Sequence, residues 1–135
     1  MTLMRWVAAA LMALIVAFGA GFAFGGSGRA TAQNALDEVR ARLDLAEARG
    51  QILEARVSLY NMNFGDASRH FEDAKAPLRR AHQRYQDEKK NAAASSIAAA
   101  LEQVAEGQRL AGKLDQASNS KANDALEAIR VATSQ

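Results

Sequence analysis

The two histidines are the residues of this chain best suited to metal binding or proton transfer, but their spacing keeps them apart. His70 and His82 lie twelve residues apart in a segment that we expect to be helical, so they point about 120° away from each other around the axis. No HExxH motif or glycine-rich phosphate loop accompanies them. The chain has no cysteine, which excludes thiolate zinc sites, iron–sulfur clusters and CxxCH haem attachment. We therefore expect no catalytic site, no metal and no cofactor, and a protein that is not an enzyme.

The segment KAPLRRAHQRYQ contains the one local charge bias of the sequence. Lys75, Arg79, Arg80 and Arg84 are cationic, and no acidic residue stands between them. Such a strip could contact anionic lipid headgroups or an acidic partner surface. An ordinary solvated helix face is the alternative, and the sequence slightly favours it. The net charge of +2 is too small to indicate a nucleic-acid partner.

Residues 6–24 carry no charge and form an apolar run behind the short N-terminal tail of residues 1–5. At 1.5 Å per residue this run spans about 28 Å as a helix, close to the hydrocarbon thickness of a bilayer. Trp6 stands at its boundary, where an indole favours the headgroup level. A cleavable signal peptide is the alternative, with "ATA" at 30–32 as its cleavage site, but its apolar run is usually only about 7–15 residues long. We expect a retained, single-pass transmembrane helix.

Small residues recur at every fourth position of this span and form one helical stripe, with two phenylalanines beside it. The stripe consists of Ala9, Ala13, Ala17, Gly21 and Gly25, and the phenylalanines are Phe18 and Phe22. Small side chains let a neighbouring helix approach closely, so these residues predict packing against other membrane-protein subunits and lipids. A composition merely common in bacterial spans is the alternative.

The charges around the span bear on its orientation. Arg5 and the amino group favour a cytoplasmic N-terminus, although Arg29, Arg40 and Arg42 follow the span at modest distance. We expect a bacterial inner-membrane protein with a periplasmic C-terminal domain.

The remainder of the chain predicts an all-α fold, with a flexible joint at residues 25–33 and a small antiparallel helical bundle at 34–135. Asn34 resembles an N-cap. A coiled-coil-like seam then steps alternately by three and four residues, with a second apolar row one position before it, and this width favours a bundle over a dimeric zipper. The seam consists of Leu36, Val39, Leu43, Ala46, Gly50, Leu53, Val57, Tyr60 and Phe64, and the second row of Leu45, Ile52 and Leu59.

The bundle should contain about four helices. We expect the first to end near Asn63, with Gly65 as the left-handed residue behind it, and the second to continue through a kink at Pro77. A third helix should cover residues 97–114 and a short fourth one residues 122–131. Between the first two helices of the bundle, Leu53, Val57, Tyr60 and Phe71 should be buried.

The stretch ARVSLYNMNFGDASRHFEDA, residues 55–74, resembles a tetratricopeptide-type helical hairpin. Ala55, Ala67, Phe71 and Ala74 fall where that family places its small and aromatic packing residues. The resemblance implies an interaction surface built from paired helices and no catalysis.

These features predict a non-catalytic, membrane-anchored accessory subunit that packs on and stabilises a larger bacterial membrane complex, respiratory or photosynthetic by analogy. A self-associating envelope scaffold and a periplasmic sensor or adaptor that binds a ligand in the bundle are the alternatives.

Overall fold

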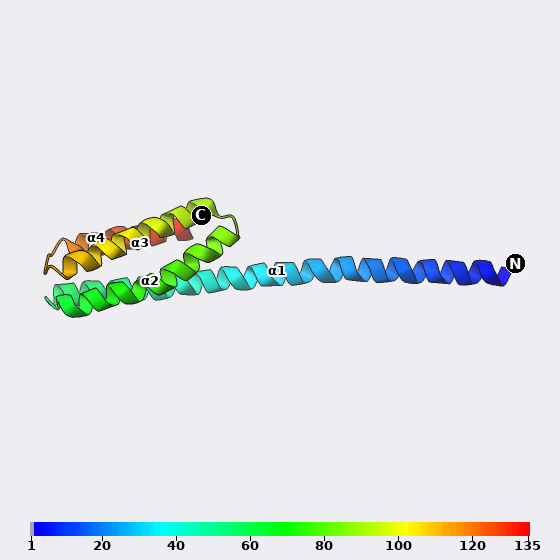
Figure 1. The fold of residues 1–135 in the computed structure, drawn as a ribbon, viewed down its shortest axis with the longest axis horizontal. Helices are drawn as coiled ribbons and strands as arrows, with labels where there is room; N and C mark the ends of the chain where they lie inside the picture. The colour runs from blue at the N-terminus through cyan, green and yellow to red at the C-terminus, as the bar shows by residue number, and fades with distance from the viewer. Residues whose placement is uncertain (1) are drawn as a thin grey trace. The chain divides into compact units, whose positions relative to one another are not determined.

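The computed structural model describes the backbone of residues 2–135 and the side chains of residues 28 and 31–135. Over residues 2–135 it contains four helices and no strand: α1 (Thr2–Tyr60), α2 (Phe64–Asp87), α3 (Asn91–Ala111) and α4 (Ser118–Thr133), as Figure 1 shows. The predicted all-α class and helical bundle are confirmed. The chain divides into two compact units, Met1–Leu36 and Asp37–Gln135, and the second unit contains the bundle.

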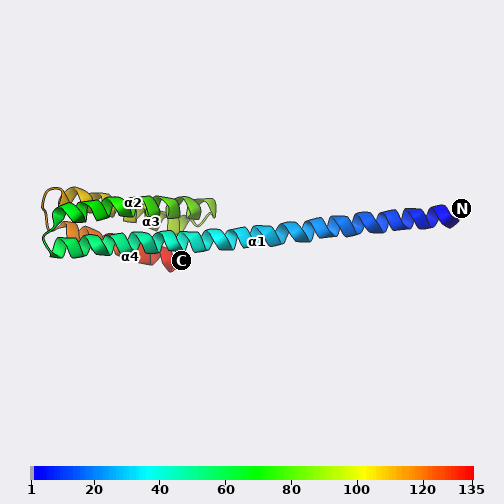
Figure 2. The same cartoon turned by 90° about the horizontal axis from the view of Figure 1, so that it is seen from below.

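Short connections make successive helices of the second unit run in opposite directions. Three residues separate α1 from α2 and α2 from α3, and six separate α3 from α4. Connections this short join antiparallel neighbours. The C-terminal part of α1 lies beside α2, and α3 lies beside α4, in both views (Figures 1 and 2).

On the face of α1 that packs on the bundle, alanines alternate with leucine and isoleucine. The buried residues step by four and three along the helix: Ala41, Leu45, Ala48, Ile52, Ala55 and Leu59. The alanines lack bulk beyond Cβ, which lets the neighbouring helices approach α1 closely. The larger residues Phe71, Leu78, Ile97 and Val104 of α2 and α3 complete the core.

The predicted seam is wrong, because most of its residues face outward. Phe64, at the start of α2, is buried as predicted, but the six large members on α1 are between 41% and 90% exposed: Leu36, Val39, Leu43, Leu53, Val57 and Tyr60. The predicted second row of Leu45, Ile52 and Leu59 is buried instead, with the alanines between. Both rows have heptad spacing, so periodicity alone does not decide which of them the bundle covers. Of the residues predicted to be buried together, Leu53, Val57 and Tyr60 are exposed, and only Phe71 is buried.

Helix boundaries also differ from the expectation at two places. α1 runs through residues 25–33, where the sequence predicts a flexible joint, and Asn34 lies inside α1 instead of capping it. α1 ends at Tyr60, and the left-handed residue after it is Met62, whose φ is 60°. Gly65 belongs to the first turn of α2, which Asn63 caps by accepting a 3.2 Å hydrogen bond from the Asp66 amide. Asn63 can do this because its short amide side chain reaches back to a free helical N–H.

The remaining boundaries follow the sequence more closely. α2 continues through Pro77 as a single helix, as predicted. α3 begins at Asn91 and α4 at Ser118, several residues earlier than the apolar patterns predict, because alanine and small polar residues extend both helices toward their N-termini.

Among the residues whose side chains the structure describes, no helix combines the length and apolar character needed to cross a bilayer. The predicted transmembrane span of residues 6–24 lies outside those residues, as does its packing stripe with Phe18 and Phe22.

Candidate functional site

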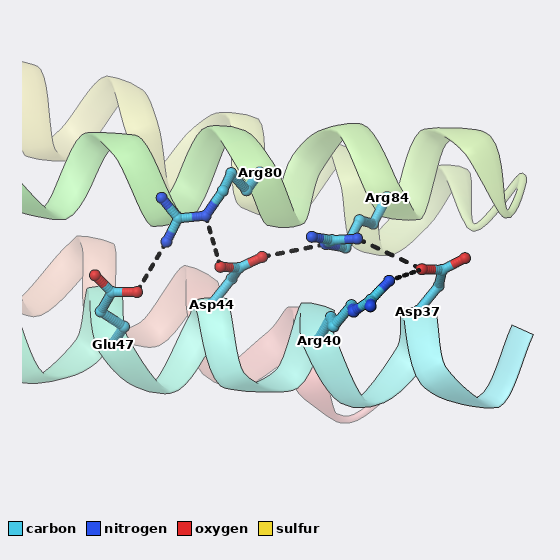
Figure 3. Close-up of polar contacts among 6 residues, drawn as sticks. All are labelled: Asp37, Arg40, Asp44, Glu47, Arg80 and Arg84. Carbon is cyan, nitrogen blue, oxygen red and sulfur yellow. Dashed lines mark hydrogen bonds and ion pairs between the residues drawn. The ribbon is translucent and has the colours of Figure 1, made fainter. Parts of the chain in front are cut away.

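The basic segment of α2 faces acidic residues on α1, and Asp44 is at the centre of this network (Figure 3). Asp44 is only 8% exposed. Its carboxylate accepts a 2.8 Å hydrogen bond from Nε of Arg80 and a 3.2 Å hydrogen bond from Nε of Arg84. The hydrogen bond to Asp44 raises the pKa of the Arg80 guanidinium above its usual value.

Further acids on α1 extend the network at both ends. Glu47 accepts a 2.8 Å hydrogen bond from Nη2 of Arg80, and Asp37 lies 3.5 Å from Nη1 of Arg84. Asp37 also lies 3.4 Å from Arg40 on its own helix. These ion pairs join the first helix of the bundle to the second. Their partners are about forty residues apart in the chain, so the charge pattern of either segment alone does not reveal them.

The other two members of the predicted basic strip are placed differently. Lys75 donates to Glu72 at 2.7 Å and to Gln108 of α3. The hydrogen bond from Lys75 lowers the pKa of Glu72. Arg79 is exposed. Arg80 and Arg84 therefore serve the contact between α1 and α2. The predicted contact with anionic lipid or an acidic partner remains a prediction, and Arg79 is the exposed cation of the strip that makes no ion pair among the described residues.

The histidines stay apart in the structure. Nδ1 of His70 lies 2.9 Å from Oε1 of Gln51 on α1, and His82 lies three turns further along α2, half-buried. Among the described residues, no group of three or more histidine or acidic side chains is placed to hold a metal ion.

A surface hollow lies where α1, the end of α2, the start of α3 and the end of α4 meet. It has a volume of about 580 Å³, and Tyr85, Lys90 and Thr133 are among its lining residues. Nζ of Lys90 lies 5.4 Å from the centroid of the Tyr85 ring and 2.9 Å from a Glu88 carboxylate oxygen. Burial raises the pKa of Tyr85. The lining includes no histidine, serine or cysteine.

The most extensive unexplained feature of the second unit is an apolar row along the side of α1 that the bundle leaves exposed. We call it the outer face of α1 and define it as Val39, Leu43, Ala46, Gly50, Leu53, Val57 and Tyr60. All seven residues are exposed, and they repeat in alternating steps of three and four. The other large apolar residues that the second unit exposes, Met62 and Leu114, lie in turns.

Two small residues at the middle of the outer face leave a shallow depression there. Ala46 and Gly50 lie one turn apart between the bulkier Leu43 and Leu53. A Cβ built on Gly50 would meet nothing within 4 Å. A second helix could therefore approach the backbone of α1 closely at this point.

No protein-family model matches the chain, and no curated protein or solved structure matches it either. The resemblance to a tetratricopeptide-type hairpin stays a prediction. Ala55, Ala67, Phe71 and Ala74 are all buried, as that resemblance implies. Burial of small and aromatic residues between two antiparallel helices is equally expected of any helical bundle.

Proposed function

We propose that the protein is a non-catalytic, membrane-anchored interaction protein, an accessory subunit that packs on and stabilises a larger membrane complex. The outer face of α1 carries this proposal. Its five large side chains are exposed on one side of a helix whose opposite side is fixed in the bundle core. Contiguous exposed apolar surface marks sites of protein or membrane contact, since covering it gains about 25 cal/mol per Å².

The apolar run of residues 6–24 supports the anchoring part of the proposal. Its length suits a bilayer, and the stripe from Ala9 to Gly25 suits close packing on neighbouring spans. In this proposal the bundle lies on the periplasmic side of a bacterial inner membrane. The likeness to accessory subunits of respiratory or photosynthetic complexes is one of architecture only.

The test of anchoring is fractionation of membranes from cells that express the unmodified chain. We expect the protein to resist extraction by alkaline carbonate and to keep its N-terminal segment in intact-mass analysis. A soluble chain that begins at Gln33 would contradict the anchor.

The test of interaction compares two charge-introducing variants after extraction in mild detergent. Leu43→Glu places a charge in the outer face, whereas Ala99→Glu places the same charge at an exposed residue of α3. We expect Leu43→Glu to lose the proteins or copies that co-purify with the wild type, and Ala99→Glu to retain them. Equal retention by both variants would show that the outer face is not the binding surface.

Two alternatives remain. A sensor or adaptor would bind its ligand in a hollow such as the one beside Tyr85 and Lys90. A self-associating scaffold would use the outer face to bind identical chains, and the charges beside that face favour this form of interaction.

A further inference from the structure

We propose that the outer face of α1 binds a second copy of this chain, and that the two α1 helices form a parallel, two-stranded coiled coil over residues 39–60. This inference rests on the proposed function, because it takes the outer face as an interaction surface and names a second copy of the chain as its occupant, which leaves contact with other subunits to the span of residues 6–24.

The outer face has the residue pattern of a coiled-coil seam. In a heptad numbering of this seam, the a positions are Leu43, Gly50 and Val57. The d positions are Val39, Ala46, Leu53 and Tyr60. The pattern holds for three heptads, a length of about 33 Å. The small residues at the middle of the seam let the two backbones come together there.

The seam is already in the conformation that a partner helix requires. The opposite row of α1, including Leu45, Ile52 and Leu59, is buried in the bundle and holds the helix in place. Association therefore does not bear the cost of ordering this segment. The bundle leaves the seam residues exposed, although Leu53, Val57 and Tyr60 also line a hollow beside Gln116 and Asn119.

The charges beside the seam are complementary between two parallel copies. The g positions are Arg42, Arg49 and Arg56. Of the charged e positions, Glu47 and Glu54 follow two of these arginines by five residues, whereas Arg40 has no g position of the seam before it. In a parallel coiled coil a g residue faces the e residue of the next heptad in the partner helix. Arg42 of one copy thus faces Glu47 of the other, and Arg49 of one copy faces Glu54 of the other.

Arg49 and Glu54 are the g and e residues that have no ion-pair partner within their own chain. Glu47 already accepts a hydrogen bond from Arg80, Arg42 pairs with Glu38 at 2.6 Å, and Arg56 donates to Asn119 at 3.1 Å. Arg49 and Glu54 are both exposed and have no hydrogen bond or ion pair among the described residues. A second copy supplies each of them with a partner.

The same charges argue against the opposite orientation. In an antiparallel pair, g positions face g positions, so the row of three arginines would meet the same row of the other copy. Like charges side by side are unfavourable. The parallel arrangement replaces this repulsion with attraction.

The experiment is a charge-reversal series on the full-length chain in mild detergent, with dissociation constants measured by sedimentation equilibrium. Arg49→Glu and Glu54→Arg should each raise the dissociation constant of the dimer about tenfold, since each replaces two interchain attractions with repulsions. An equimolar mixture of the two variants should regain the wild-type affinity as a heterodimer, and so should the chain that carries both substitutions. Circular dichroism should show the same helix content in every variant, because both residues are exposed.

Orientation is tested with single cysteines, because the chain has none of its own. Val57→Cys should cross-link to itself on mild oxidation, since the same a position of two parallel copies is adjacent. A mixture of Leu43→Cys and Val57→Cys should give mainly like-with-like products. Preferential cross-linking of one variant to the other would show an antiparallel pair and overturn the inference.

Two further results would overturn it. One is a wild-type chain that stays monomeric at every concentration, and the other is a dimer whose affinity neither charge reversal changes. The proposed function would survive either result if Leu43→Glu still released a different protein from the complex. If the dimer forms as expected but the chain is not retained in membranes, the anchoring proposal fails and the inference stands.

Discussion

The ring of Phe71 occupies the space that a side chain at position 107 would need. A Cβ built on Gly107 would lie 2.9 Å from Cζ and 3.0 Å from Cε1 of the Phe71 ring. Phe71 is fully buried, so its ring has little room to move aside. Ser118, also buried, donates a 2.8 Å hydrogen bond to the carbonyl oxygen of Gly107. Helices α2, α3 and α4 therefore meet at one glycine.

Gly107→Ala should lower the stability of the bundle. Overpacking of a tight core costs about 1–3 kcal/mol, and the better helix propensity of alanine offsets about 1 kcal/mol of this. We expect circular dichroism to show a lower melting temperature for Gly107→Ala than for the wild type. In a chain that already carries Phe71→Leu, Gly107→Ala should lower the melting temperature by less. Gly65→Ala is the matched control, because its nearest neighbour is Asn63 Oδ1 at 3.9 Å. Equal melting temperatures for both alanine variants would show that the ring yields easily.

The sequence predicts the number and class of the helices well, but it does not predict which side of α1 the bundle covers. Two apolar rows with the same heptad spacing run along this helix, and the row with the larger side chains resembles a core more closely. The bundle covers the other row, in which Ala41, Ala48 and Ala55 alternate with Leu45, Ile52 and Leu59.

The ion pairs of the site were equally inaccessible from the sequence. Asp44 and Arg80 stand in separate helices, 36 residues apart, and only the folded hairpin brings them together. The basic segment of α2 was visible as a charge bias, whereas its acidic partners on α1 are interspersed with arginines. The sequence alone shows the complete heptad pattern of the outer face. It does not show that these residues are exposed.

Ile52 and Leu53 are adjacent residues of similar size that test the assignment of the two faces. Ile52→Ala should cost about 2–5 kcal/mol of unfolding free energy, because Ile52 is fully buried. Leu53→Ala should cost far less, since Leu53 is 41% exposed, but it should weaken self-association. Both are measured by denaturant unfolding at protein concentrations below the dissociation constant of the dimer. A larger loss from Leu53→Ala would restore the face that the sequence alone favours.

Asp44 and Glu47 both pair with Arg80, and they differ mainly in burial. Asp44→Ala removes hydrogen bonds from two arginines to a buried carboxylate and should cost about 1–2 kcal/mol in denaturant unfolding. Glu47→Ala removes one exposed ion pair and should change stability by about 0.5 kcal/mol or less. If the two substitutions cost the same, the network contributes as a set of ordinary surface pairs.

Stability should decrease in acid through three exposed ion pairs. Hydrogen bonds from Lys75, Arg109 and Arg130 lower the pKa values of Glu72, Glu106 and Glu127 below the usual value of a glutamate. A carboxylate whose folded pKa is lowered contributes stability above its unfolded pKa and loses it as pH falls through the folded pKa. The effect is modest because solvent screens these pairs.

The measurement for this pH dependence is the melting temperature between about pH 5 and pH 3. A variant with glutamine at all three glutamates should lose less of its melting temperature over that interval than the wild type. It should start from a slightly lower value at neutral pH, because the three pairs are already absent. An identical pH profile for the two proteins would show that other carboxylates govern the acid response.

Three helices of this chain end in a left-handed residue that is not glycine, and one of them offers a stabilising substitution. After α3, Leu114 has φ of 57°, and the amide of Asp115 donates to the carbonyl of Leu110 at 3.0 Å, which completes the helix C-cap. A non-glycine residue in this conformation costs about 1–2 kcal/mol, and Leu114 is 70% exposed and so gains little from burial. Leu114→Gly should therefore raise the melting temperature by a few degrees, after allowance for the greater entropy of glycine in the unfolded chain.

Lys113→Gly is the control, because Lys113 is outside the left-handed region and its substitution should give no gain. A lower melting temperature for Leu114→Gly would mean that the leucine side chain stabilises the turn by more than its backbone strain costs.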